Sequence, residues 1–218
     1  MFTLSEENYL KAIYHLQNET SGEVSTNAIA ERIKAKASSV SDMLKKLAEK
    51  EVVLYKKHRG VSLTKLGIQS ASKVVRKHRL WEVFLADKLH FPWDEVHDIA
   101  EQLEHIKSEK LTERLDQFLG FPKHDPHGDP IPDRFGNVQD SEKKILSELI
   151  IGQEATLVGV GDSSAKFLQF LDKNKIALWK SIIVLEKEDF DNSLRIKIND
   201  QTLHISEQIA TNLYIKEK

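Results

Sequence analysis

The sequence predicts a mainly α-helical protein with a small β domain at its C-terminal end. Apolar residues recur at helical spacing through most of the first 120 residues. Four of the five prolines then fall in the segment 121–133, which can therefore be neither a helix nor a central strand. From residue 141 onward, short strand-like apolar runs follow one another closely, and this spacing favours a small barrel.

The composition limits the class and the location of the protein. The chain has 218 residues, of which 40% are hydrophobic, and this suits one large globular domain or a few small ones. It has no apolar run long enough to cross a bilayer and no signal-peptide pattern, so we expect a cytoplasmic protein without a membrane partner. It has no cysteine, so any metal site would use oxygen and nitrogen donors.

The net charge of −2 conceals two segments of opposite charge. Residues 32–59 carry nine Lys or Arg against three acids, whereas residues 94–119 carry eight acids against three bases. This asymmetry indicates an anionic partner for the first segment and a cationic partner for the second.

The first 63 residues have the pattern of a winged helix-turn-helix domain. Helices are expected at 5–19, 25–35 and 38–53, and Ser25 or Thr26 can cap the second of them. Two short extended runs, "VVLYK" and "GVSLT", lie on either side of "KHRG" and predict a hairpin. Two helices joined by a tight turn and followed by a basic hairpin are typical of this class of DNA-binding domain.

The start of the third helix and the hairpin hold the candidate DNA-contacting residues. Short polar side chains at the N-terminal end of a recognition helix can approach base edges, and basic side chains bind phosphates. The candidates are Lys36, Ser38, Ser39, Ser41, Asp42, Lys45, Lys46, Lys56, Lys57 and Arg59. For Asp42 a capping box with Ser39 is the favoured alternative, because a carboxylate repels phosphate. Each lysine, taken alone, also fits a solvated surface charge.

Two long helices are expected in the middle segment, residues 64–122. Thr64 can cap the first, which runs to about Leu89 before "FPW" breaks it. The second is expected from Asp94 to Leu119, with Gly120 as its stop signal. Residues 123–140 form a proline-rich linker or ordered loop. Residues 141–218 form the barrel, with strands at 154–161, 180–187, 193–198 and 201–206 and a short helix at 163–174.

The stretch "HDIAEQLEH" places two imidazoles and two carboxylates on one helix face. At about 100° per residue, the positions concerned fall within an arc of roughly 100°: His97, Glu101, Glu104 and His105. His78 and Glu82 form another pair, four residues apart on the preceding helix. Such a set can bind a divalent metal, but it can also be a solvated polar stripe, and the residues alone leave both interpretations open.

The order of these features resembles the diphtheria toxin repressor family of metal-dependent regulators. The resemblance rests on a winged helix followed by "RKHRLWE", "VHDIAEQLEHIKSE", "DPHGDPIP" and a small barrel, and it spans nearly the whole chain. It implies a homodimer whose helical segment carries the dimer interface and metal sites, and an SH3-like, FeoA-like C-terminal domain. The implied metal ligands are a primary set of Asn8, Glu101, Glu104 and His105, an ancillary set of His78, Glu82 and His97, and further ligands at Asp125, His127 and Asp162.

Three positions depart from the family's pattern. Position 8 is Asn, where iron sensors carry Met and manganese sensors carry Asp, so an amide oxygen would lower the charge of the primary site. Position 11 is Lys, where the two-domain manganese sensors carry Glu, and this disfavours their paired-metal site. Trp179 stands where glycine is usual in the C-terminal fold.

The resemblance implies a repressor, not an enzyme, that binds a double-stranded DNA operator and turns off metal-uptake genes when metal is plentiful. Mn²⁺ is the favoured metal and Fe²⁺ the second, while Co²⁺, Ni²⁺, Zn²⁺ or Cd²⁺ are expected to substitute in vitro. One alternative is a winged-helix regulator with a signal other than metal. Another is a metallohydrolase that uses the same His and Glu cluster, although the sequence has no H-E-x-x-H or G-x-S-x-G motif.

Overall fold

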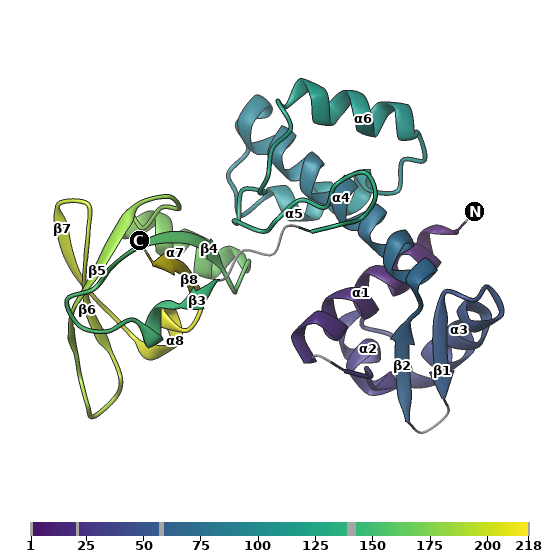
Figure 1. The fold of residues 1–218 in the computed structure, drawn as a ribbon, viewed down its shortest axis with the longest axis horizontal. Coiled ribbons are helices and arrows are strands. Elements are labelled where there is room, and N and C mark those ends of the chain that lie inside the picture. The colour runs from purple at the N-terminus through teal and green to yellow at the C-terminus, as the bar shows by residue number, and fades with distance from the viewer. Residues whose placement is uncertain (1, 21, 57–58, 139–142, 218) are drawn as a thin grey trace. The chain divides into compact units, whose positions relative to one another are not determined.

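A computed structural model describes residues 2–20, 22–56, 59–138 and 143–217. The described residues form two compact units. The first contains residues 2–81, 100–121 and 131–138, and the second contains residues 82–99, 122–130 and 143–217. The fold is mainly helical with a C-terminal β-sheet, as predicted (Figure 1).

The first unit begins with a winged helix-turn-helix. Three helices precede an antiparallel hairpin: α1 (Leu4–Thr20), α2 (Thr26–Arg32), α3 (Ala37–Glu49), β1 (Val53–Lys56) and β2 (Gly60–Leu63). Figure 1 shows the three helices gathered beside this hairpin. Their apolar faces meet in a core whose fully buried side chains include Leu10, Ile13, Ile29, Leu44 and Leu47. The apolar residues that recur at helical spacing therefore form the buried faces of these helices.

Helix capping follows the sequence at α2 but not at α3. The Ser25 hydroxyl accepts a hydrogen bond from the Ala28 N–H at 3.1 Å, as expected of an N-cap. The predicted capping box of Ser39 and Asp42 is wrong, because the N-cap of α3 is Lys36, three residues before Ser39. The Asp42 carboxylate instead pairs with Lys45, three residues further along the exposed face, at 3.0 Å.

The middle of the chain contains three helices rather than two. Helix α4 (Lys65–Leu89) agrees with the prediction, and the Thr64 hydroxyl accepts from the Gly67 N–H at 3.1 Å. The predicted second long helix is wrong, because α5 (Val96–Leu103) ends before α6 (Glu109–Phe118) begins. The Ser108 hydroxyl accepts from the Leu111 N–H and so starts a new helix there.

This break decides where the acidic cluster lies. Glu104 and His105 belong to the turn that follows α5 and not to a continuous helix face. The end of α6 is as expected, since Gly120 adopts a φ of +77°, the left-handed conformation that glycine takes readily after a helix.

The proline-rich segment is an ordered loop in which, among its described residues, there is neither a helix nor a regular strand. Within the second unit, the Asp125 carboxylate accepts hydrogen bonds from the backbone N–H groups of His127 and Asp129, each at 2.9 Å. The loop packs directly on β4, and a Cβ on Gly128 would lie 2.1 Å from the Val158 carbonyl oxygen. Only glycine therefore fits at this point.

The C-terminal part of the second unit is a six-stranded antiparallel sheet. Its strands lie in the order β3, β8, β4, β5, β6, β7. Their bounds are β3 (Lys144–Ile145), β4 (Glu154–Val160), β5 (Ser181–Lys187), β6 (Leu194–Ile198), β7 (Gln201–Ile205) and β8 (Leu213–Glu217). A 3₁₀ turn η1 (Leu146–Glu148) and the helices α7 (Ala165–Lys173) and α8 (Glu207–Ala210) complete it.

The four strands and the helix predicted in this part are confirmed, whereas β3, β8 and α8 were not predicted. The register shifts between Leu157 and Gly159 and between Val184 and Glu186, and such irregularities help a sheet to coil. Among the described residues, no helix combines the length and the apolar composition needed to span a bilayer.

Candidate metal centre

One face of α1 contacts the turn that follows α5, and the contact is made by charged and polar side chains. Glu7, Asn8 and Lys11 lie within about one turn of α1. The Lys11 ammonium pairs with Glu101 and with Glu104, in the second case at 2.7 Å. We call this group, together with His78 and His105, the Glu104 site.

Glu104 lies at the centre of this site. Its side chain is fully buried, and its Oε2 lies 2.6 Å from His78 Nδ1 as well as 2.7 Å from Lys11 Nζ. Burial raises the pKa of Glu104, but the His78 hydrogen bond and the Lys11 charge outweigh it, so the pKa lies below its usual range. Glu104 is therefore a buried carboxylate that stays ionised because positive groups surround it.

His105 is held in one orientation by Glu7. His105 Nδ1 lies 2.6 Å from Glu7 Oε2, and because an ionised carboxylate can only accept, this nitrogen carries the proton. The other ring nitrogen, Nε2, lies 3.6 Å from Glu104 Oε1, and in the neutral imidazole this nitrogen carries the lone pair. This is the arrangement by which a carboxylate orients a metal-binding histidine. Glu7 was not predicted, since nothing along the chain relates it to His105.

The donors of the Glu104 site fit a divalent cation. Two buried acceptor atoms, Asn8 Oδ1 and Glu104 Oε1, have no hydrogen-bond partner among the described residues. Buried acceptors without partners are costly, so Glu104 Oε1 and Asn8 Oδ1, which lies within about one turn of Glu7 and Lys11 on α1, are each suited to a ligand. The ligand favoured by their chemistry is a cation, because a cation, the Lys11 ammonium, already lies against the two carboxylates. Oxygen donors with one or two imidazoles suit Mn²⁺ and Fe²⁺.

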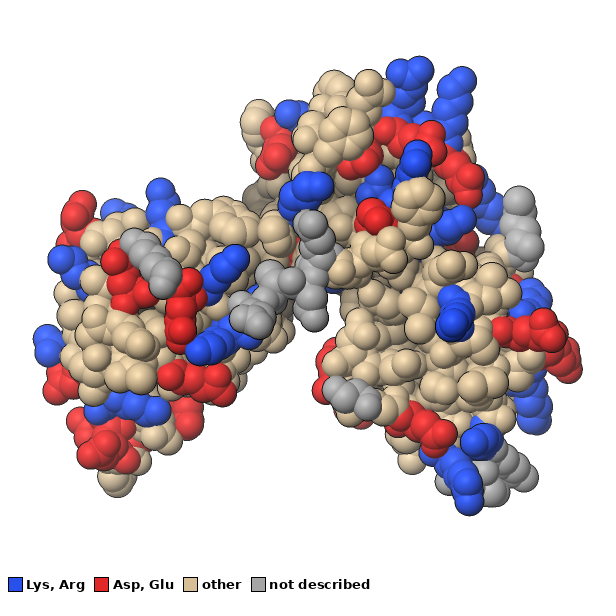
Figure 2. All heavy atoms as spheres, in the orientation of Figure 1, with Lys and Arg blue, Asp and Glu red and all other residues tan. Residues whose placement is uncertain are grey.

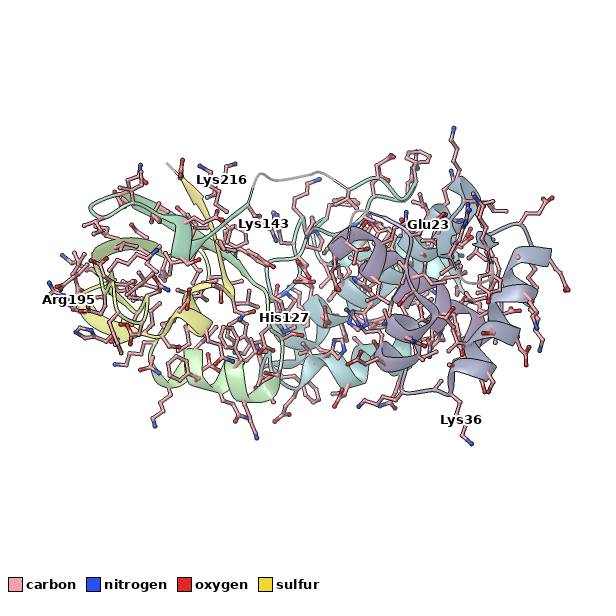
Figure 3. The ribbon with its side chains drawn as sticks, turned by 90° about the horizontal axis from the view of Figure 1, so that it is seen from below. Glu23, Lys36, His127, Lys143, Arg195 and Lys216 are labelled. Atoms are coloured by element: carbon pink, nitrogen blue, oxygen red, sulfur yellow. The ribbon has the colours of Figure 1, made fainter. Side chains whose placement is uncertain are left out.

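A second group of ligand-type side chains lies within the second unit. Donor atoms of Glu82, Asp125 and His127 lie within 4.8 Å of one another, and all three residues are buried. His127 Nε2 lies 2.9 Å from the Trp93 carbonyl oxygen and therefore carries a proton. In the neutral imidazole, Nδ1 then carries the lone pair, and it lies 3.8 Å from Glu82 Oε1. We call these three residues the His127 site. Figure 3 shows the labelled His127 among other side chains rather than at the outer edge.

Two members of the implied ancillary set also contact residues outside that set. His78 lies with Glu104, as described above. Glu82 lies with Asp125 and His127, and the half-exposed His97 approaches it with Nδ1 at 3.4 Å from Glu82 Oε1. The carboxylate of Asp162 accepts from the Ser164 N–H at 2.7 Å, at the start of α7, and is not one of the three clustered residues.

The candidate DNA-contacting residues form an exposed surface on α3 and the hairpin. Among them, Lys36, Ser38, Ser39, Lys46, Lys56 and Arg59 are exposed. Figure 3 shows the labelled Lys36 extending away from the ribbon, and Figure 2 shows Lys and Arg atoms at the tip of the hairpin. Ser41 is half-buried and donates to the Ala37 carbonyl, and Asp42 and Lys45 pair with each other. Lys57 lies outside the described residues.

Three family models match consecutive parts of the chain. Residues 1–61 match the N-terminal DNA-binding domain of iron-dependent repressors. Residues 64–133 match the metal-binding and dimerisation domain of the same repressors. Residues 144–217 match the FeoA domain.

Individual proteins show the same similarity. A diphtheria toxin repressor from Corynebacterium jeikeium is 33% identical over 147 residues, which are 66% of this chain and 61% of that protein. A solved manganese-dependent transcriptional repressor in complex with manganese is 36% identical, with a TM-score of 0.89, over 98% of this chain and all of that one. The solved manganese regulator SloR is 34% identical, with a TM-score of 0.77, over 98% of each chain.

Proposed function

Because the chain belongs to the diphtheria toxin repressor family of metal-dependent regulators, we propose that it is a transcriptional repressor activated by a divalent metal ion. It binds an operator in double-stranded DNA as a homodimer, in the cytoplasm, and represses genes of metal uptake. Membership of a family of DNA-binding regulators confirms the prediction that the chain is not an enzyme. The proposed parts are a DNA-binding domain (1–63), a dimerisation and metal-binding domain (64–122), a linker (123–140) and an SH3-like domain (141–218).

The observation that carries this proposal is the polar contact between α1 and the turn after α5. Helix α1 belongs to the winged helix, and it offers Glu7 and Asn8 to the same site as Glu104 and His105. Glu101, Glu104, His105 and Asn8 would hold the metal, and Glu7 would keep His105 in the orientation that presents Nε2. When bound, the ion supplies positive charge that binds these donors together. The ion can shift the conformational equilibrium only to the extent that it binds one arrangement of α1 more tightly than another.

A homodimer agrees with the surface of the first unit. Large apolar side chains are exposed on and after α6, at Leu111, Phe118 and Phe121. A second copy of the chain that covered them would remove this apolar area from water. We therefore place the dimer contact on this helix.

We favour Mn²⁺ over Fe²⁺ as the physiological metal. The proposed primary donors are mostly oxygen atoms with one imidazole, and Mn²⁺ accepts such donors readily. The manganese-dependent repressors described above are similar to this chain over nearly its whole length, which supports the same choice.

The test is a titration of operator binding with each metal. Fluorescence anisotropy of a labelled operator fragment, followed under anaerobic conditions, should show that Mn²⁺ tightens binding and that chelation reverses the effect. Fe²⁺ should act at higher concentration. DNA binding that is tight and indifferent to every divalent metal would favour a winged-helix regulator with another signal and would contradict the proposal.

A further inference from the structure

We propose that Lys11 is a built-in competitor of the metal. In the metal-free protein its ammonium group neutralises the carboxylates of Glu101 and Glu104, and it leaves them when a divalent ion enters the Glu104 site. The inference rests on the proposed function, because it takes the Glu104 site to be a metal site. It adds a regulatory element: the lysine sets how much metal is needed before the protein responds.

The contacts of Lys11 place it where a cation would bind. Its Nζ pairs with both Glu101 and Glu104, and its side chain is only 12% exposed. The partners belong to α5 and the turn that follows it, about 90 residues along the chain from Lys11. The lysine therefore connects α1 to this turn without any metal.

The ammonium group satisfies the site only in part. It leaves Asn8 Oδ1 and Glu104 Oε1, both buried, without a hydrogen-bond partner among the described residues. Lys11 carries one positive charge on a group with three donors, whereas a divalent ion carries two and can accept several donor atoms at once. The site therefore gains contacts when a divalent ion enters it.

Lys11 and a divalent ion cannot bind the same oxygen atoms together. Their like charges repel strongly at the few ångströms that would separate them, especially in a site that excludes most water. The Lys11 ammonium group can also move from the site into solvent, because the lysine side chain is a flexible four-carbon stem and the Glu101 side chain beside it is 36% exposed. Metal binding is therefore an exchange of one cation for another, and the lysine lowers the apparent affinity for the metal.

The first experiment measures Mn²⁺ affinity in a Glu82→Gln variant, so that the His127 site lacks one of its three ligand-type side chains. Lys11→Met in this background keeps the length of the side chain and removes its charge. Free Mn²⁺ is counted by its electron paramagnetic resonance signal. We expect Lys11→Met to tighten Mn²⁺ binding by about tenfold or more, because a competing charge at contact distance is removed.

The matched control is Lys50→Met in the same background. Lys50 follows α3 and pairs at 2.6 Å with the buried Glu6 of α1, the helix that also carries Lys11, but it contacts no proposed ligand. We expect its Mn²⁺ affinity to stay the same as that of the parent. If Lys11→Met leaves the affinity unchanged or weakens it, or if the Glu82→Gln protein binds no Mn²⁺ with or without Lys11, the inference is overturned.

The second experiment uses the unmodified chain and observes the exchange directly. An amine-acylating reagent is applied with and without Mn²⁺, and the modified lysines are quantified by peptide mass spectrometry. Lys11 should become several-fold more reactive when Mn²⁺ is added, while the exposed Lys45 serves as the internal reference. Equal reactivity of Lys11 in both conditions would show that it does not move.

The two proposals fail separately. Absence of any metal effect on operator binding by the unmodified chain contradicts the proposed function. A normal metal effect on operator binding, together with an unchanged affinity in Lys11→Met, contradicts only the role of Lys11.

Discussion

Replacement of Glu104 by Gln tests the centre of the proposed site. In the metal-free protein, Glu104 Oε2 accepts two charge-assisted hydrogen bonds, from His78 at 2.6 Å and from Lys11 at 2.7 Å. A neutral amide oxygen can still accept both, so each bond should lose only its charge-assisted part, about 1 kcal/mol. The free energy of unfolding of the metal-free variant should therefore fall by about 2 kcal/mol, and the variant should still fold.

The effect on metal binding should be much larger. Replacement of a group that merely orients a ligand costs about 10–100-fold in metal affinity, so loss of a central carboxylate should cost at least about a hundredfold. Urea unfolding gives the first quantity, and Mn²⁺ titration in the Glu82→Gln background gives the second. Glu109→Gln is the control, because Glu109 is an exposed acid on α6 that pairs weakly with Lys73 at 3.4 Å. A Glu104→Gln protein that binds Mn²⁺ as tightly as its parent would refute this assignment.

Three other predictions follow from the same geometry. Lys46→Ala and Arg59→Ala should each weaken binding to all DNA sequences alike and reduce the slope of log K against log salt by about 1, in anisotropy titrations at several salt concentrations. Asn8→Asp should tighten Mn²⁺ binding, and Glu101→Cys should shift the response toward Fe²⁺ or Co²⁺, in anaerobic metal titrations. Burial, with the nearby charges of Arg79, Lys11 and Arg32, lowers the pKa of His15 to about 3. As pH falls below about 6.5, His15 is therefore protonated in the unfolded chain but not in the folded chain, and the free energy of unfolding falls. Between pH 7.5 and pH 5, urea unfolding should show that His15→Gln loses about 2 kcal/mol less of its free energy of unfolding than the unmodified chain does.

The winged helix could be predicted because its determinants are local. The apolar positions of α1 and α3 recur at helical spacing, and the side chains that they place inward, such as Leu10 and Leu44, are fully buried. The same holds for the four predicted strands of the C-terminal sheet. The strands β3 and β8 escaped prediction because β3 has only two residues and β8 has only five, of which the last two are charged and exposed.

The site could be predicted only in part, because its contacts join distant segments. The spacing of Glu101, Glu104 and His105 indicated a cluster of ligands, but it also suggested one continuous helix. In the structure α5 ends at Leu103, and Ser108 caps the start of a separate helix, α6. The pairs Glu7–His105 and Lys11–Glu104 are 98 and 93 residues apart along the chain. No local periodicity relates such residues, so only tertiary packing reveals them.

The position of the Glu104 site sets a thermodynamic requirement on the protein. Helix α1 contributes both to the core of the winged helix, through Leu10 and Ile13, and to the site, through Glu7 and Asn8. Any change of α1 that alters the donor positions therefore also alters the support of the DNA-binding surface. Because linkage is reciprocal, the factor by which Mn²⁺ tightens operator binding must equal the factor by which operator DNA tightens Mn²⁺ binding. A factor greater than one would show that the metal and the DNA favour the same arrangement of the protein, and Lys11 would oppose that arrangement by favouring the metal-free side.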